Sequence, residues 1–241
     1  MLTKRILISL QSADELKTVA GMGFDWLDLK NPAAGSLGCP SRNEAEAFYE
    51  LASRTIDRNR SFLSIALGEL LEEAWTEVLP IAKEFDFVKV ALAGCSDRDD
   101  WQERVQELAA KLAAKNKLIL VHYADCQLAC SPSWNETLDM AVSLESQYIL
   151  IDTFDKRAGR LWDWYSPQAI QKLVKNGLAN GVRLSIAGSL HIDELEEART
   201  FGAEVIGVRG AACQDGSRTN GLCRDRLKQL SELFSNQTIT V

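Results

Sequence analysis

A carboxylate and an ammonium stand two residues apart in an otherwise apolar stretch, as Asp28 and Lys30 of "DWLDLK". In a strand, side chains two residues apart point to the same face, and the apolar neighbours argue against an ordinary surface there. Lys89 has similar surroundings within "FVKVAL". A charged side chain in apolar surroundings needs a partner or a function. The sequence therefore predicts buried charged groups at these three positions.

Lysines gathered in apolar surroundings can act as nucleophiles. A free lysine has a pKa of about 10.4 and is almost wholly protonated at pH 7. Burial and mutual repulsion among Lys30, Lys89 and Lys156 would lower the pKa of at least one of them, and Asp28 and Asp152 would limit the fall. A neutral amine attacks carbonyl carbons. These residue types therefore favour Schiff-base chemistry on a carbonyl substrate.

The segments that carry these residues belong to a repeat along the whole chain, in which short β-rich runs alternate with helical patterns. The predicted strands are 5–10, 25–30, 62–67, 87–92, 118–123, 148–153, 182–188 and 205–210. The predicted helices are 12–22, 41–56, 69–84, 97–115, 133–145, 167–178, 191–201 and 222–235, with N-caps at Ser12, Ser133 and Ser166. We expect a single-domain (βα)8 TIM barrel over residues 1–241. The alternative, a doubly wound open sheet, lacks a Gly-x-Gly-x-x-Gly after the first strand.

The barrel prediction says where the chemistry should lie, because active sites of this fold occupy the C-terminal ends of the strands. The polar residues at or just after predicted strand ends are Asp28, Lys30, Glu69, Lys89, His122, Asp125, Asp152, Lys156, Ser189 and Arg209. Any one of them alone could be a solvated residue of the rim. Together they predict a charged site at the mouth of the barrel, with His122 and Asp125 on the substrate.

The seventh and eighth predicted strands end in small residues of the kind that hold an anion. Gly188 and Ser189 lie between a strand and a helix start, and Arg209 and Gly210 follow the next strand. Small residues let backbone N–H groups approach a phosphate, and an arginine can add a bidentate contact. Glycines also serve tight turns without any ligand. Two such turns side by side, with an arginine, predict a phosphorylated substrate.

Composition limits the partners. The net charge is -7, with 27 basic and 34 acidic residues and no long basic run, which argues against nucleic acid. No apolar segment approaches the roughly 20 residues needed to cross a bilayer, and the short N-terminal apolar run lacks a cleavage site. We expect a cytoplasmic protein. Trp162 and Trp164, close together near one loop, allow for an interface in a homo-oligomer.

Six cysteines show no Cys-x-x-Cys pair and are interpreted as free thiols. His122, Cys126 and Cys130 recur every four residues, a spacing that would align zinc ligands on a helix. His122 ends a predicted strand, however, so the helical alignment would fail. We therefore predict no metal site.

Several motifs resemble one family. "DLKNPAAGSLG", "VKVALAG", "HYAD", "DTFDKRAGRLWDW" and "AGSL" resemble, in this order and over residues from about 5 to 212, the (5-formylfuran-3-yl)methyl phosphate synthases. These are also called 4-(hydroxymethyl)-2-furancarboxaldehyde-phosphate synthases. The resemblance implies a lyase that condenses two molecules of glyceraldehyde 3-phosphate into a phosphorylated furan aldehyde, with loss of phosphate and water. It also implies a place in the biosynthesis of methanofuran-type one-carbon carriers.

The resemblance also implies roles for individual residues. It gives Lys30 as the Schiff-base lysine and Lys89 as the proton acceptor, with Asp28, Asp152 and Lys156 as further polar residues of the site. No metal or organic cofactor is expected, because the imine serves as the electron sink. Two alternatives remain: a Schiff-base aldolase acting on another phosphorylated aldehyde, and a non-catalytic barrel that binds a sugar phosphate.

Overall fold

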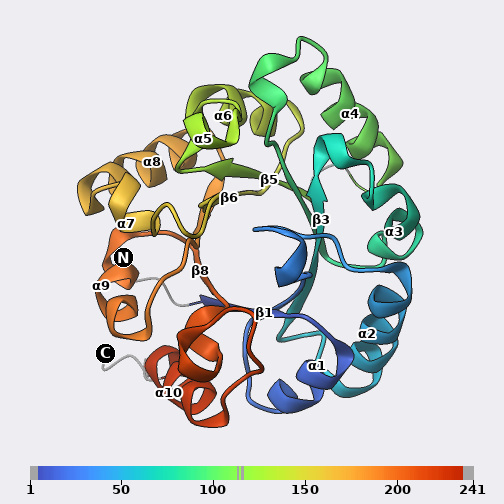
Figure 1. Cartoon of the computed structure of the whole chain (residues 1–241), viewed down its shortest axis with the longest axis vertical. Helices are drawn as coiled ribbons and strands as arrows, with labels where there is room; N and C mark the ends of the chain where they lie inside the picture. The colour runs from blue at the N-terminus through green and yellow to red at the C-terminus, as the bar shows by residue number, and fades with distance from the viewer. Residues whose placement is uncertain (1–4, 113, 115–116, 236–241) are drawn as a thin grey trace.

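Eight parallel strands close into a barrel in the order of the sequence, and helices surround it (Figure 1). The computed structural model describes residues 5–112, 114 and 117–235. The strands are β1 (Arg5–Leu10), β2 (Trp26–Leu29), β3 (Phe62–Glu69), β4 (Phe87–Ala91), β5 (Leu118–Tyr123), β6 (Tyr148–Asp152), β7 (Arg183–Ile186) and β8 (Val205–Val208). Pairing of β1 with β8 closes the ring. The prediction of a (βα)8 barrel is confirmed.

Each predicted segment contains a helix, usually shorter than predicted, and two further short helices, 126–129 and 161–164, lie where no helix was predicted. The α-helices are α1 (Ala13–Val19), α2 (Arg42–Thr55), α3 (Trp75–Ala82), α4 (Trp101–Lys111), α5 (Cys126–Ala129), α6 (Trp134–Ser143), α7 (Leu161–Trp164), α8 (Pro167–Ala179), α9 (Leu195–Ala198) and α10 (Arg224–Ser235). The predicted 69–84 helix is broken by Glu73, whose φ is 55°, so that a 3₁₀ turn, η2 (Leu70–Glu72), precedes α3. Residues 113 and 115 of the predicted 97–115 helix lie outside the described residues.

The three predicted N-caps are confirmed. The side chains of Ser12, Ser133 and Ser166 each accept a hydrogen bond from a backbone N–H in the first turn of the following helix. Ser133 forms a full capping box with Glu136, and Pro167 occupies the first position after Ser166. These caps fix where three helices leave the barrel. Within the described residues, no helix is long and apolar enough to span a membrane.

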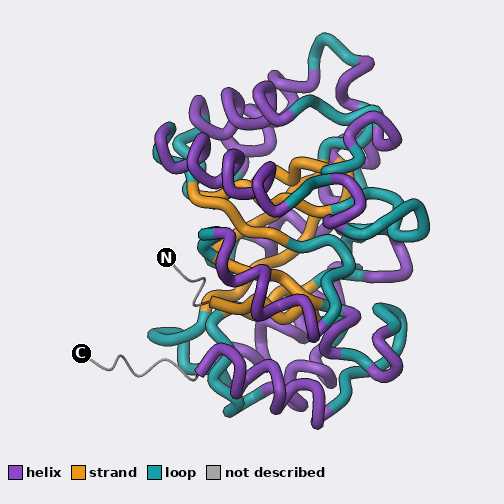
Figure 2. The backbone as a smooth tube through the Cα atoms, turned by 90° about the vertical axis from the view of Figure 1, so that its left-hand side faces the viewer, coloured by secondary structure: helices purple, strands orange, loops and turns teal. Residues whose placement is uncertain are grey.

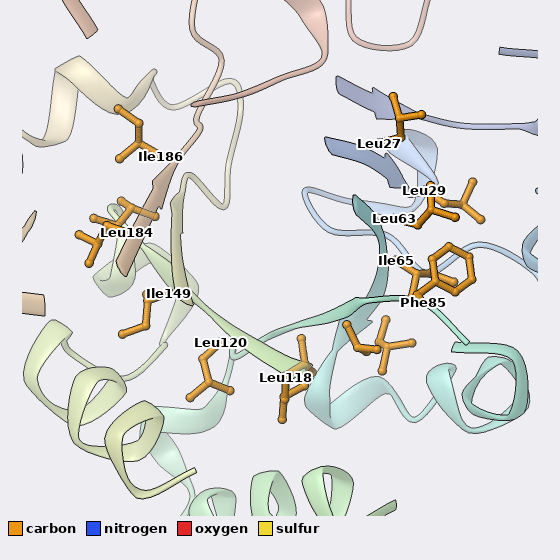
Figure 3. Close-up of a cluster of buried hydrophobic side chains, with 14 of the residues drawn as sticks. Leu27, Leu29, Leu63, Ile65, Phe85, Leu118, Leu120, Ile149, Leu184 and Ile186 are labelled. Carbon is orange, nitrogen blue, oxygen red and sulfur yellow. The ribbon is translucent and has the colours of Figure 1, made fainter. Parts of the chain in front are cut away.

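Alternation along the strands sorts the side chains into two layers. Outward-facing aliphatic residues of the strands, together with Phe85 just before β4, fill the space between the barrel and the helices. Figure 3 shows this layer, with Leu27, Leu29, Leu63, Ile65, Phe85, Leu118, Leu120, Ile149, Leu184 and Ile186 labelled. Figure 2 shows the strands running through the middle of the molecule with helices on either side.

Inward-facing aromatic residues close the N-terminal end of the barrel. Trp26, Phe87 and Tyr148 pack with ring centroids 4.7 to 5.4 Å apart. Asp28 and Lys89 lie two residues further along β2 and β4, with the same parity as Trp26 and Phe87, so they also point into the barrel. The interior is therefore apolar at its base and charged towards the C-terminal ends of the strands.

Candidate active site

A cavity of about 660 Å³ opens at the C-terminal ends of the strands. Lys30, Lys89, Asp152 and Lys156 line it, together with the loops after β7 and β8. Lys30 directly follows β2, Lys89 lies on β4 and Asp152 ends β6. Residues of alternate strands form one layer inside such a barrel, so these side chains meet although they are far apart in sequence. The structure thus brings together the residues chosen for Schiff-base chemistry.

Asp28 and Lys89 form a buried ion pair at the base of the cavity. The Lys89 Nζ lies 2.6 Å from the Asp28 Oδ2, and the two side chains are 3% and 0% exposed. The hydroxyls of Ser9 and Ser64 donate to the same carboxylate at 3.3 and 2.6 Å. Removing one partner of such a pair would leave an uncompensated buried charge. Asp28 therefore holds Lys89 in place and balances its charge.

Lys30 lies above this pair, with its Nζ donating to the carbonyl of Ser36 at 3.3 Å. Burial lowers the pKa of Lys30 to about 7; Asp152 opposes the fall, and the charges of Lys156 and Lys89 add to it. About half of the molecules would then carry a neutral amine at pH 7. The lowered pKa is what was expected for at least one of the lysines, and the role of Lys30 as a nucleophile stays a prediction.

Asp152 and Lys156 form a second ion pair at the cavity wall. The Lys156 ammonium contacts the Asp152 Oδ1 and donates to the Thr153 hydroxyl at 3.0 Å. Burial alone would raise the pKa of Asp152, but the charges of Lys156 and Lys30 outweigh it and the pKa lies below its ordinary value. Burial lowers the pKa of Lys156, against the attraction of Asp152. The pair can exchange protons with a ligand in the cavity.

The loop after β2 folds over the mouth of the barrel, where Figure 1 shows it in blue near the centre of the ring. The Asn31 N–H donates to the carbonyl of Gly38 at 2.8 Å, and the Asn31 side chain caps the 3₁₀ turn η1 (Pro32–Ala34). A Cβ at Gly38 would lie 2.2 Å from the Asn31 carbonyl oxygen, so only glycine fits. Ser36 ties this loop to β6 by donating to the Thr153 carbonyl at 2.7 Å. The loop of residues 31–38, which follows Lys30 in the "DLKNPAAGSLG" segment, therefore covers the Lys30 side chain.

Four of the predicted phosphate-binding residues line the same cavity, namely Gly188, Ser189, Arg209 and Gly210. Gly188 and Ser189 have φ values of 112° and 56°, and a left-handed serine is a strained conformation. A Cβ at Gly188 would come within 3.0 Å of the Leu161 Cβ. The backbone here therefore takes a special shape, and phosphate binding by it remains a prediction.

Arg209 lines the cavity but has a different role from the one expected. Its guanidinium pairs with Glu15 at 2.5 and 2.9 Å and also donates to the carbonyls of Ser9, Arg218 and Asn220. These bonds use all five N–H groups of the side chain. No donor is left for a bidentate contact to phosphate, so the predicted contact does not fit this geometry. Arg209 instead anchors the segment after β8.

We therefore expect Arg209→Met and Glu15→Gln to act mainly on stability. Each variant breaks the buried pair and should lower the free energy of unfolding by about 3 kcal/mol in urea titrations. The Arg209→Met/Glu15→Gln double variant should lose less than the sum of the two, because neither charge is then left alone. Additive losses would contradict this assignment.

His122 and Asp125 do not reach the cavity, contrary to the expected substrate contacts. His122 points outward from β5; its Nε2 lies 2.9 Å from the Tyr165 hydroxyl, and burial lowers its pKa to about 4. The Asp125 carboxylate accepts the N–H groups of Phe154 and Asp155 at 2.7 and 2.9 Å. Asp125 thus shapes the loop that carries Lys156. The strand parity of His122, opposite to that of Tyr123, already indicated its outward direction.

Glu69 also lies outside the residues that line the cavity. It accepts hydrogen bonds from the Tyr123 hydroxyl at 2.6 Å and from the Ala93 N–H at 2.8 Å.

The zinc alternative finds no support in the geometry, since no group of three His, Cys, Asp or Glu residues within the described chain is placed to hold a metal ion.

Sequence reasoning missed two arginines of the cavity, Arg218 and Arg226. Arg218 lies in the segment between β8 and α10, and its Nη2 donates to the Gly35 carbonyl at 2.5 Å. Arg226 lies in the first turn of α10. Neither ends a strand, so strand-end reasoning could not find them. The basic residues of "GSRTNGLCRDR" were the only available signal.

Comparison with known proteins identifies the family to which the chain belongs. Residues 6–231 match the sequence profile of 4-HFC-P synthase. The chain belongs to this family. It is 28% identical to the (5-formylfuran-3-yl)methyl phosphate synthase of Methanopyrus kandleri, over 96% of this chain and 99% of that one. It is 26% identical to the protein of the same name from Methanocaldococcus jannaschii, over 95% and 98% of the two chains. Membership of this synthase family makes the chain an enzyme.

Solved structures with the same architecture have far lower identity. Phosphoribosyl anthranilate isomerase from Thermus thermophilus superposes with a TM-score of 0.60 at 14% identity, over 96% of this chain and 98% of that chain. A 3-hexulose-6-phosphate synthase from Salmonella typhimurium gives 0.60 at 12% identity, also over 96% and 98%. At such identities the likeness extends to the fold alone.

Proposed function

We propose that this enzyme condenses two molecules of glyceraldehyde 3-phosphate into (5-formylfuran-3-yl)methyl phosphate. It would act as a carbon–oxygen lyase on phosphates and supply the furan of methanofuran-type carriers. The observation that carries the proposal is Lys30, a buried amine with a pKa of about 7 between two ion pairs, in a family of furan phosphate synthases. A half-neutral lysine in a cavity is what imine formation with an aldehyde requires.

The product restricts where the new bonds form. Two triose phosphates minus one phosphate and two waters give the composition of the furan. Its branch carbon carries the phosphorylated methylene group, so it is C2 of the triose that keeps its phosphate. The new carbon–carbon bond therefore joins this C2 to C3 of the other triose, the carbon from which phosphate departs. One triose must become a nucleophile at C2 and the other an electrophile at C3.

Lys30 makes the nucleophile. Its neutral amine forms an imine with the aldehyde of the first triose and releases one water. Loss of the C2 proton then gives an enamine whose nucleophilic carbon is C2. Lys89 takes this proton, and transfer of its own proton to Asp28, 2.6 Å away, would leave the neutral amine needed for that step. The iminium nitrogen serves as the electron sink, so no metal is needed.

The Asp152–Lys156 pair acts on the second triose. It removes the C2 proton, and the C3–O bond breaks with its electrons leaving on phosphate, which gives 2-hydroxyacrolein. The enamine carbon, C2 of the first triose, attacks C3 of this acceptor. The hydroxyl oxygen on C2 of the second triose then bonds to the imine carbon, C1 of the first triose. Loss of the remaining tertiary hydroxyl as water and of the Lys30 amine then gives the aromatic ring. The lowered pKa of Lys156 suits it to proton transfers of this kind.

The retained phosphate belongs with the loops after β7 and β8 in this proposal. Gly188, Ser189 and Gly210 line the cavity there, and small or left-handed residues expose backbone N–H groups to an anion. This is also where barrels of this type commonly hold phosphate.

The imine can be tested directly. Incubation with glyceraldehyde 3-phosphate and reduction with borohydride should attach the triose to the peptide that contains Lys30, as read by peptide mass spectrometry. Lys30→Ala should lose this adduct, whereas the exposed control Lys17→Ala should keep it. An adduct confined to Lys89 or Lys156 would overturn the assignment of the nucleophile.

Product analysis separates the remaining alternatives. A furan aldehyde absorbs in the near ultraviolet, whereas a simple aldol does not. With glyceraldehyde 3-phosphate alone, we expect this absorbance to appear together with one inorganic phosphate for each furan. An adduct with neither furan nor phosphate would favour the aldolase, and binding without an adduct would favour the non-catalytic barrel.

A further inference from the structure

Six lysines and arginines of the described chain line the cavity. Three of them pair with a carboxylate: Lys89 with Asp28, Lys156 with Asp152, and Arg209 with Glu15. Lys30 is the amine whose pKa is lowered to about 7. Among the described residues that line the cavity, the guanidinium groups of Arg218 and Arg226 form no ion pair.

Arg218 is held at the catalytic end of the cavity. Its side chain donates to the carbonyl of Gly35, the residue before Ser36, whose own carbonyl accepts the Lys30 ammonium. Its charge is also felt by Lys156: after burial and the opposing effect of Asp152, Arg218 helps to lower the pKa of Lys156. Arg218 therefore binds the loop that covers Lys30, lines the same cavity as Asp152 and Lys156, and acts on this pair through its charge.

The backbone of Arg218 is fixed from the other side. The buried Arg209 donates to the carbonyls of Arg218 and Asn220, and a β-bridge between Cys213 and Leu222 closes the base of the segment. We call residues 213–223 the arm. Arg209, itself fixed by its ion pair with Glu15, holds the arm through these hydrogen bonds. The fold therefore sets the position of Arg218 at the cavity.

Most hydrogen-bond donors of the Arg218 guanidinium have no partner among the described residues. One N–H binds Gly35, and the structure shows no bond from its other four N–H groups to a described residue. Burial lowers the pKa of Arg218, and the charge of Asp152 opposes the fall only in part, so a further anion beside Arg218 would relieve an unfavourable charge. Asp152, Asp193 and Asp215 also line the cavity, but none of them forms an ion pair with Arg218 within 4.0 Å.

We propose that Arg218 binds the phosphate that leaves, so that the cavity has a second phosphate subsite besides the loops after β7 and β8. This inference rests on the proposed function, in which one phosphate stays and one departs. In the elimination step the C2 proton goes to the Asp152–Lys156 pair, and the electrons of the C3–O bond go to the departing phosphate. A guanidinium at this oxygen stabilises the charge that develops there.

The test uses Arg218→Gln, with Arg218→Lys as the conservative variant and Arg224→Gln as the control. Arg224 is an exposed arginine at the start of α10. We expect kcat for furan formation to fall about 100-fold in Arg218→Gln, to recover in part in Arg218→Lys, and to stay unchanged in Arg224→Gln. Product inhibition by inorganic phosphate should weaken at least tenfold in Arg218→Gln, whereas inhibition by the furan phosphate should not change.

Borohydride trapping distinguishes a phosphate contact from a merely structural role. Imine formation on Lys30 precedes and does not require the departing phosphate, so Arg218→Gln should trap as much triose as the unaltered enzyme. Equal losses of trapping and of kcat would show that Arg218 only supports the Gly35 loop, and would overturn the proposal. Unchanged inhibition by inorganic phosphate would overturn it as well.

Titration with inorganic phosphate alone tests the subsite without any turnover. Calorimetry should find two phosphate sites in the unaltered enzyme and one in Arg218→Gln. If no furan forms with the unaltered enzyme, the proposed function fails, and this titration still decides whether Arg218 holds a phosphate. A single site in both proteins would contradict the second subsite.

Discussion

Lys30→Ala is expected to lower kcat for furan formation by about 10⁴-fold or more. The side chain supplies the nucleophile, and removal of a covalent catalyst costs more than removal of a group that only transfers a proton. Protein stability should rise slightly or stay unchanged, because the variant no longer buries an amine whose charged form is unfavourable there. Steady-state furan absorbance and a urea titration measure the two effects. Activity within about tenfold of the unaltered enzyme would exclude Lys30 as the nucleophile.

The pH dependence of imine formation follows from the same amine. Burial lowers the pKa of Lys30 to about 7, and only the neutral form reacts. The rate of trapping should therefore rise about tenfold per pH unit below 7 and level off above it. Lys30→Arg, which stays charged throughout this range, should trap no triose. A rise centred near pH 10 would mean that the cavity does not desolvate Lys30.

The fold could be predicted from the sequence because its signals are local. Each βα unit carries its own strand pattern, helical period and cap, as at Ser133 with Glu136. The predicted helices erred where a single backbone conformation decides the outcome. Glu73 takes a left-handed conformation that splits one predicted helix, and nothing in the hydrophobic period marks that position.

The gathering of charged residues at the cavity was predictable for a similar reason. A charged residue inside an apolar strand, such as Lys89, stands out in the sequence, and parity along the strand gives its direction. The resemblance implies a different role for each lysine, and these roles stay predictions. The structure adds what spacing cannot give, namely that Asp28 pairs with Lys89 and that burial is the main cause of the lowered pKa of Lys30.

The arginines were the part that sequence reasoning missed or misassigned. Arg209 directly follows a strand, as a ligand-binding residue would, but its partner Glu15 lies 194 positions away, and Glu15 and three backbone carbonyls take all its donors. Arg218 lies in an irregular segment, and its position depends on that same distant pair. Contacts between residues so far apart in sequence carry no periodic signal. Only the folded chain shows which arginine keeps donors for a ligand.

The Asp28–Lys89 pair allows stability and catalysis to be separated. Asp28→Asn leaves the Lys89 ammonium buried without its carboxylate, so the free energy of unfolding should fall by about 3 to 5 kcal/mol in urea titrations. Lys89→Met leaves Asp28 with only the hydroxyls of Ser9 and Ser64 as partners, and it should also be destabilised. In the Asp28→Asn/Lys89→Met double variant no charge is stranded, and much of the lost stability should return.

Activity should not return with it. If Lys89 accepts the C2 proton, both Lys89→Met and the double variant should form the trapped imine but make furan about 10² to 10⁴ times more slowly. The matched measurement is exchange of the C2 proton for deuterium in the imine, read from the adduct after borohydride reduction. This exchange should be fast in the unaltered enzyme and slow in both variants. A double variant that regains exchange along with stability would show that the pair only supports the barrel. Stability without exchange would instead place the proton transfer on Lys89, because the barrel is then intact and only the base is missing.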